Sequence, residues 1–164
     1  MNKTYTGLAK RLVDVTDDTE KGAIIDRLTR RECKGVSPIL LAQLDQHSVN
    51  IQVSIAFCMR ELANKKAKLM ICDILSREDL HEEVRGAFTE VVGHHNIQNC
   101  LPIMISQLNH PSPYIRFWTC DALGWLNPLN LEELIKPLLD DHEIGWDNQT
   151  VSESVQHALA RYRD

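Results

Sequence analysis

One pattern of apolar residues returns along the chain at a nearly constant spacing, and it constrains the fold more than any other feature. Residues 38–52, PILLAQLDQHSVNIQ, match residues 102–116, PIMISQLNHPSPYIR, at a distance of 64 residues. Between these two copies, residues 84–93 (VRGAFTEVVG) match residues 115–124 (IRFWTCDALG). The resulting period of about 32 residues predicts an array of structural repeats, each too small to bury its apolar face alone.

The repeated segment has the periodicity of an α-helix. A common template starts at Ile51, Val84, Ile115 and Val151, at spacings of 33, 31 and 36 residues, and its apolar residues fall at positions 1, 5, 8, 9 and 12. These positions share one helix face. Because another apolar helical segment precedes each start, every repeat is predicted to be a helix, a short turn and a second helix. The expected fold is all-α, without a β-sheet. The predicted units are approximately residues 4–33, 37–64, 66–95, 97–127 and 130–164.

Capping residues are expected in the turns between these helices. Ser48 and Ser112 each precede a predicted helix start, and Pro113 suits a first helical position. Asp79 followed by Glu82 resembles a capping box.

The segments VR…VVG of residues 84–93 and IR…ALG of residues 115–124, together with the turn HPSP of residues 110–113, resemble the HEAT-repeat superfamily. They are most similar to the short bacterial HEAT-like repeats also found in phycobilin lyases. The resemblance implies a single-domain α-solenoid over residues 1–164, a right-handed superhelix of about five helix pairs whose second helices line a concave face. It also implies that Arg85 and Arg116, at template position 2, link adjacent units through carboxylates or helix-end carbonyls.

The charge of the chain is unevenly distributed. Residues 1–82 carry a net charge of +1, whereas residues 83–164 carry −6. An acidic surface is unsuited to a phosphate backbone, which is bound through Lys and Arg. We therefore expect no nucleic acid and predict a protein partner with a basic surface.

Template positions 3, 6, 7 and 10 are expected to face the open groove, where aromatic anchors among carboxylates would suit a cationic partner. Phe57 and Phe117 are the aromatic residues at these positions, although packing between repeats is the alternative for both. Trp118 and Trp125 are assigned to the core or to packing between repeats. Trp146, in the polar segment 140–150, either plugs the end of the array or is an exposed anchor. The predicted partner-binding residues are Phe57, Glu90, Phe117, Asp121, Trp146, Glu153 and His157.

Other classes of site have little support in the sequence. No phosphate loop, Rossmann glycine pattern or HExxH motif is present, so we expect neither cofactor nor metal. No apolar run approaches the roughly 18 residues of a membrane span, and the first residues lack the apolar stretch of a signal peptide. The five cysteines contain no CxxC motif and are expected to be reduced, in keeping with a cytoplasmic protein.

The sequence thus predicts a non-catalytic protein-interaction module. Its sharpest version is a bacterial immunity or antitoxin-like inhibitor that covers the basic site of a toxin such as a nuclease. Two classes of enzyme are the alternatives. One is a tetrapyrrole-handling protein of the phycobilin-lyase type. The other is a HEAT-like DNA glycosylase, which uses aromatic residues and an acid in its concave groove. Phe117, Trp118 and Asp121 superficially resemble that set, but such an enzyme needs a basic groove.

The repeat phase leads to a stability prediction at Ile115, which holds template position 1. Replacing Ile115 with Ala should lower the free energy of unfolding by ~2–5 kcal/mol, because a buried Ile is truncated. Urea denaturation measures the loss. A loss below ~1 kcal/mol would show that the template phase is wrong.

Overall fold

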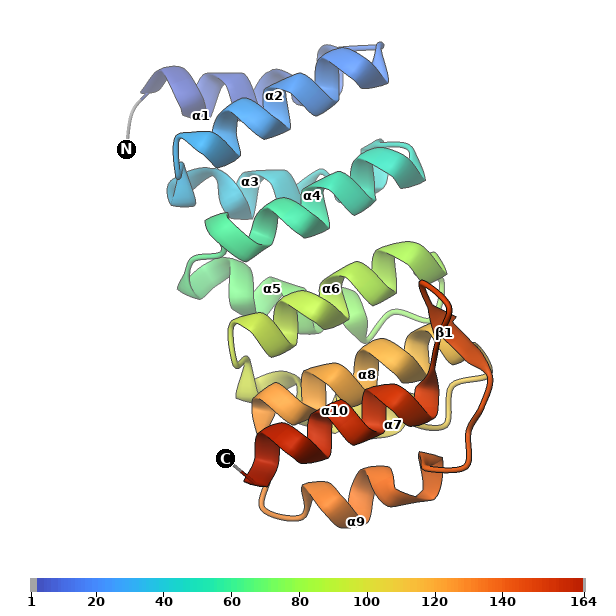
Figure 1. Ribbon diagram of the computed structural model, residues 1–164. Coiled ribbons are helices and arrows are strands. Elements are labelled where there is room, and N and C mark those ends of the chain that lie inside the picture. Colours follow the sequence, from blue (N-terminus) through green and yellow to red (C-terminus); the bar gives the residue numbers. More distant parts are fainter. Residues whose placement is uncertain (1–2, 164) are drawn as a thin grey trace. The chain divides into compact units, whose positions relative to one another are not determined.

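The computed structural model describes residues 3–163, which form two compact units, Met1–Ile74 and Leu75–Asp164, here called the N-terminal and C-terminal units. The N-terminal unit is helical (Figure 1). Its α-helices are α1 (Lys3–Lys10), α2 (Asp18–Arg30), α3 (Ser37–Ala42), α4 (Val49–Leu62) and α5 (Lys65–Leu75), of which α5 ends one residue beyond the unit. Short 3-10 turns connect them at Arg11–Asp14, Lys34–Val36 and Leu44–Gln46.

Within the N-terminal unit, second helix packs on second helix and first helix on first helix. Helix α2 lies against α4, and α1 contacts α3 as well as α2. The side chains between them include Leu12, Leu28, Leu40 and Ile55, all fully buried. This is the arrangement expected of successive helix pairs that merge their apolar faces.

The C-terminal unit repeats the arrangement and adds a short β-hairpin (Figure 1). Its elements are α6 (Glu82–His94), α7 (Leu101–Gln107), α8 (Pro113–Leu126), α9 (Leu131–Ile135), β1 (Ile144–Trp146), β2 (Gln149–Thr150) and α10 (Val151–Arg163), with 3-10 turns at Gln98–Cys100 and Lys136–Leu138. Helices α6, α8 and α10 lie side by side with α8 in the middle, while α7 and α9 contact α8 from the other layer. Helix α8 is therefore the most enclosed element of the unit.

The residues that cap the N-termini of α4, α6 and α8 differ in part from those predicted. Ser48 and Ser112 are the N-cap residues of α4 and α8, but neither side chain caps its helix, and the Ser48 hydroxyl donates to Asp18 instead. The capping box predicted at Asp79 and Glu82 is wrong. His81 is the N-cap of α6, and its Nδ1 accepts a hydrogen bond from the Glu83 N–H at 3.3 Å. His81, the residue directly before the first turn of α6, therefore caps this helix in place of Asp79.

The expectation that no β-sheet forms is wrong for residues 144–150. Ile144 pairs with Thr150 and Trp146 with Gln149 in an antiparallel hairpin. Its two turn residues, Asp147 and Asn148, have φ values of 46° and 61°. Positive φ at both central residues is the geometry of a type I′ turn, which is common in hairpins with two-residue loops. Asn and Asp tolerate this geometry.

The buried positions of the template agree with the structure. Val84, Ile115 and Val151, the position-1 residues of the last three copies, are each 0% exposed. The described residues contain ten α-helices, and their bounds follow the predicted helical segments. The stacking of all the pairs into one right-handed superhelix, and the single domain over residues 1–164, stay predictions. No helix within the described residues is both long and apolar enough to cross a membrane.

The cysteine prediction holds for three of the five residues. Cys33, Cys58 and Cys120 carry free thiols. Burial raises the pKa of both Cys58 and Cys120 to about 12, which keeps these two thiols protonated and unreactive at neutral pH. Cys72 and Cys100 are disulfide-bonded, so the expectation of five reduced thiols is wrong for these two.

Two glycines allow the second helices of the C-terminal unit to approach closely. A Cβ on Gly93 would lie 2.9 Å from the Cα of Ala122, and one on Gly124 would lie 2.8 Å from the Cα of Ala158. Both contacts are with backbone, which cannot rotate away. Both glycines hold template position 10, which was expected to face the open groove, and instead they set the α6–α8 and α8–α10 contacts.

We therefore expect Gly124→Ala to destabilise the protein by roughly 1–3 kcal/mol, because the added methyl group forces α8 and α10 apart. The matched control is Gly22→Ala in α2, where nothing lies within 4 Å of an added Cβ. That substitution should stabilise the protein by about 0.5–1 kcal/mol, through helix propensity alone. Thermal and urea unfolding of the two variants would compare them, and a shift of the same sign in both would contradict the assigned close contact.

Candidate protein-binding surface

Helix α8 has a single open stripe. From residue 114 to residue 126, the side chains that are part exposed or exposed follow one another at spacings of four, three and four residues. They are Tyr114, Trp118, Asp121 and Trp125. Trp125 is 54% exposed. The other side chains from Ile115 to Leu126 are buried, since α6 and α10 flank the helix and α7 and α9 cover its inner side. The stripe is therefore the face through which α8 can contact a partner.

Three aromatic side chains gather at the N-terminal end of the stripe, and we call Tyr114, Trp118 and Trp146 the aromatic patch. The ring centroid of Trp118 lies 6.4 Å from that of Tyr114 and 5.3 Å from that of Trp146, which the hairpin supplies. Trp146 remains 46% exposed. Beneath the patch, the buried ring of Phe117 meets Trp118 edge-on at 5.4 Å. Aromatic side chains that are part exposed and held by neighbours are typical anchors of protein interfaces.

Carboxylates lie near the aromatic patch. The pKa of Tyr114 is raised, first by burial and further by the negative charges of Glu83, Glu90 and Glu82. These three acids come from α6, whose Gly86 lies directly under the Tyr114 ring, so that a Cβ there would meet it at 2.3 Å. The patch thus combines part-exposed and exposed aromatic rings with the negative charges of nearby carboxylates.

The C-terminal end of the stripe is already occupied by an arginine of α10. The guanidinium carbon of Arg161 lies 4.6 Å from the centroid of the Trp125 ring, in a cation–π contact. The same guanidinium ion-pairs with the carboxylate of Asp121 and donates a 3.2 Å hydrogen bond to the Asp121 carbonyl oxygen. Asp121 is therefore engaged within the chain.

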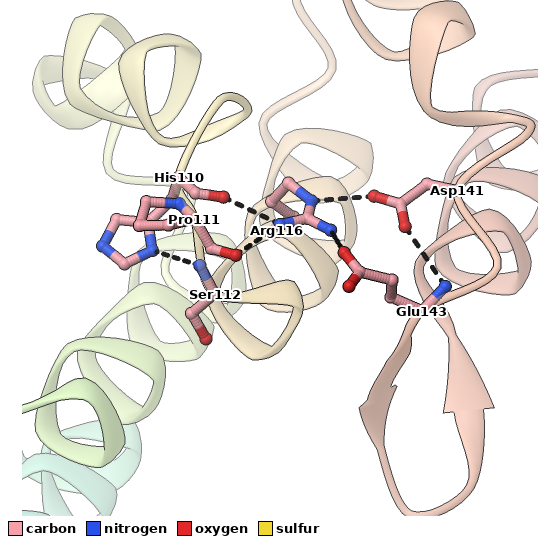
Figure 2. Close-up of polar contacts among 6 residues, drawn as sticks. All are labelled: His110, Pro111, Ser112, Arg116, Asp141 and Glu143. Atoms are coloured by element: carbon pink, nitrogen blue, oxygen red, sulfur yellow. Dashed lines mark hydrogen bonds and ion pairs between the residues drawn. The ribbon is translucent and has the colours of Figure 1, made fainter.

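The hairpin that carries Trp146 is held by Arg116 (Figure 2). The guanidinium donates from Nε to Asp141 at 2.7 Å and from Nη2 to Glu143, both just before β1. Its Nη1 donates to the carbonyl oxygens of His110 and Pro111 at 2.8 and 2.9 Å. The hydrogen bond to Asp141 is the main reason that the pKa of Arg116 is raised. The structure confirms that Arg116 links carboxylates and turn carbonyls.

Glycine at position 145 completes this attachment. A Cβ on Gly145 would lie 2.4 Å from the Cβ of Phe117. The hairpin backbone therefore packs directly on α8, and this contact explains both the burial of Phe117 and the position of Trp146 beside Trp118.

The predicted partner-binding residues fall into three groups. Phe57, 45% exposed, belongs to the N-terminal unit, whereas the other six belong to the C-terminal unit. Glu90, Trp146 and His157 have part-exposed or exposed side chains. The remaining three, Phe117, Asp121 and Glu153, are committed to contacts within the chain.

Phe117 is corrected from an exposed anchor to a packed side chain, because it is 5% exposed under Gly145. Glu153 serves as a capping residue of α10. Its carboxylate accepts from the Thr150 N–H at 2.7 Å, while the Thr150 hydroxyl accepts from the Glu153 N–H at 3.2 Å. The Thr150 backbone hydrogen bond is the main reason that the pKa of Glu153 is lowered. The burial of Phe117 follows from the hairpin, which the sequence did not indicate. The role of Glu153 is local, because residues 150–153 read TVSE, the pattern of a capping box.

The aromatic patch was missed because the predicted helix face was rotated. Positions 4 and 11 were assigned to packing, yet on α8 they are Trp118, which is part exposed with a buried indole nitrogen, and Trp125, which is exposed. Positions 3 and 10, assigned to the groove, are Phe117 and Gly124, which are buried. The small residues at position 10 were the available signal, since glycine in consecutive helices indicates close helix contact as readily as open space.

The Arg116 contacts predict a large effect on stability. Replacing Arg116 with Ala should cost about 3–5 kcal/mol, because the carboxylate of Asp141, whose side chain is 12% exposed, loses its partner. The matched control is Arg30→Ala in α2, where the ion pair with Asp26 has side chains 77% and 54% exposed and contributes about 0–1 kcal/mol. Urea unfolding curves measure both. Equal small losses would mean that the Arg116 contacts do not hold the hairpin.

Among the described residues there is no group of three or more His, Cys, Asp or Glu side chains placed to hold a metal ion. A family model of HEAT repeats matches residues 69–160, which is more than half of the 164-residue chain. Neither the curated proteins nor the solved structures include a match. HEAT repeats generally mediate protein–protein interactions and are typically non-catalytic scaffolds. The internal repeats, the packing of second helix on second helix and the family match together show that this chain belongs to the HEAT-repeat family.

Proposed function

We propose that this protein is a non-catalytic binding module that holds a basic protein partner on the α8 stripe, with an arginine of the partner seated on the aromatic patch. The observation that carries the proposal is the contact of Arg161 with Trp125 and Asp121 at the other end of the same stripe. There the chain itself shows which side chain a tryptophan and a carboxylate on this face accept. A guanidinium satisfies both, because it stacks on a ring and ion-pairs through its edge.

The aromatic patch offers the same combination to a second molecule. Trp118 and Trp146 supply ring faces, and no arginine of the described residues stacks on either of them. Glu83, an exposed residue of α6 whose charge acts on Tyr114, supplies a carboxylate. The partner arginine would thus occupy at Trp118 the position that Arg161 occupies at Trp125.

Charge and position extend the proposed surface beyond one arginine. The net charge of −6 over residues 83–164 favours a basic partner and speeds its approach. Glu90 of α6 and His157 of α10 share template position 7 with Asp121 of α8 and flank the stripe. We include both in the proposed contact surface, together with Trp146. Phe57, on the N-terminal unit, stays a separate candidate.

An inhibitor that covers the basic site of a toxin is one form of this function and rests on the same charge. The glycosylase-like alternative relied on Phe117, Trp118 and Asp121. Since Phe117 is buried and Asp121 is bound to Arg161, those three do not form the set that it needs. No described feature favours a tetrapyrrole over a basic protein.

The test is a titration with a nine-residue arginine peptide, followed through the indole N–H signals of the three tryptophans in ¹H–¹⁵N spectra. Trp118 and Trp146 should shift, whereas Trp125, already covered by Arg161, should not. A nine-residue lysine peptide of equal charge should bind more weakly, because an ammonium lacks the planar fork that stacks and ion-pairs at once. Affinity for both peptides should fall as salt rises.

Variants localise the binding. Trp146→Ala should weaken the arginine peptide roughly two- to fivefold, as expected for an exposed cation–π contact. Arg161→Ala uncovers Trp125 and Asp121 and should bring the Trp125 signal into the response. Glu132→Lys, at an exposed residue of α9, is the control for net charge and is compared with Glu83→Lys beside the patch. If it weakens binding as much as Glu83→Lys does, or if only Trp125 shifts in the unmodified protein, the aromatic patch is not the site.

A further inference from the structure

Two arginines occupy equivalent places in successive repeats but have different partners. Arg85 and Arg116 share template position 2, and each is 8% exposed. Arg116 is bound by two carboxylates and two carbonyl oxygens. Arg85 donates from Nη1 to the carbonyl oxygen of Leu75 at 2.8 Å and from Nη2 to that of Arg77. Carbonyl oxygens satisfy N–H groups but carry no full negative charge to balance the cation.

The electrostatic consequence is visible in the two guanidinium groups. Burial lowers the pKa of Arg85, whereas the hydrogen bond to Asp141 raises the pKa of Arg116. Among the described residues, no carboxylate forms an ion pair with Arg85. The carboxylate of Asp79, which is ion-paired with Arg77, acts on Arg85 electrostatically and raises its pKa against the effect of burial. Arg85 is thus a buried cation without the ion pair that its counterpart has, and such a group is costly to bury.

A cavity of about 420 Å³ lies beside Arg85, which is one of its lining residues. Its lining includes Arg85, Arg77 and Glu78 as well as Ser106, Gln107 and His110. All of these residues belong to the C-terminal unit. The volume falls within the range of pockets that hold small molecules, about 300–1,000 Å³.

Two further lining residues have an N–H donor for which the described residues show no acceptor. The Nδ1 of His110 accepts a 3.1 Å hydrogen bond from the Ser112 N–H, so in the neutral ring the proton is on Nε2, which is then a donor. Burial and the charges of Arg85 and Arg116 lower the pKa of His110, which favours this neutral form. The amide nitrogen of Gln107, a residue 5% exposed, is buried and has no hydrogen-bond partner among the described residues.

We propose that this cavity is a binding site for a carboxylate group, which pairs with Arg85 as Asp141 pairs with Arg116. A carboxylate is planar and acceptor-only, and thus matches a guanidinium and an imidazole N–H at once. The carboxylate belongs either to a free organic acid or to the C-terminus of a peptide. Glu78, the one acid of the lining, opposes the anion, so its removal should strengthen binding.

The experiment follows the side-chain Nε–H signals of the arginines in ¹H–¹⁵N spectra as the full chain is titrated with succinate, with the dipeptide Ala-Ala and with Ala-Ala amide. Succinate or Ala-Ala should shift the Arg85 signal and raise Tm. The Arg116 signal, whose group already holds two carboxylates, is the internal control and should stay. Tighter binding of Ala-Ala than of succinate would assign the site to peptide termini, and the reverse would assign it to free acids.

Two substitutions test the site without removing Arg85, which packs in the interior. Glu78→Gln should tighten the dissociation constant of the better ligand roughly three- to tenfold, by removing a like charge at close range. Ser106→Asp places a carboxylate in the cavity wall and should raise Tm while abolishing the response to ligand. A response of equal size to Ala-Ala amide, or no movement of the Arg85 signal by either acid up to 50-fold molar excess, would overturn the proposal.

Discussion

The close contact of α8 with both of its neighbours is the constraint on which the rest of the C-terminal unit depends. Gly93 of α6 lies against the backbone of α8, and Gly124 of α8 lies against the backbone of α10. The side chains between these helices are buried. A helix enclosed in this way keeps one narrow stripe in contact with solvent. Whatever α8 presents to another molecule must therefore come from that stripe or from an element laid against it, and the hairpin is such an element.

The periodicity of the sequence was sufficient to predict the helices, because apolar spacing reports which residues share a face. It located Val84, Ile115 and Val151 correctly in the core. It could not determine how wide the buried face is, since width depends on how many helices surround the one in question. The middle helix of three is buried on most of its surface, and the hairpin backbone at Gly145 also covers Phe117, whereas Trp118 stays part exposed.

The hairpin could not be predicted from local pattern for a related reason. Residues 140–150 are polar and short, and their conformation depends on tertiary contacts: Arg116 binds Asp141 and Glu143, and Gly145 packs on Phe117. Asp147 and Asn148 permit the turn but do not require it. Arg116 itself was predicted to link units through carboxylates or carbonyls. The sequence therefore indicated that Arg116 binds another segment, but not that this segment is a hairpin.

The attachment of the hairpin also has a consequence for the order in which the molecule can assemble. Arg116 reaches partners 25 and 27 residues further along the chain, and Arg161 reaches back 40 residues to Asp121. Contacts of such separation form after the local helices, because the intervening loops must close first. We therefore expect Trp146 and Arg161 to take their places late in folding and to leave them early in partial unfolding. Fraying of the last repeat would remove the ring beside Trp118 and the cover over Trp125 together, while the helices of the N-terminal unit keep their own core.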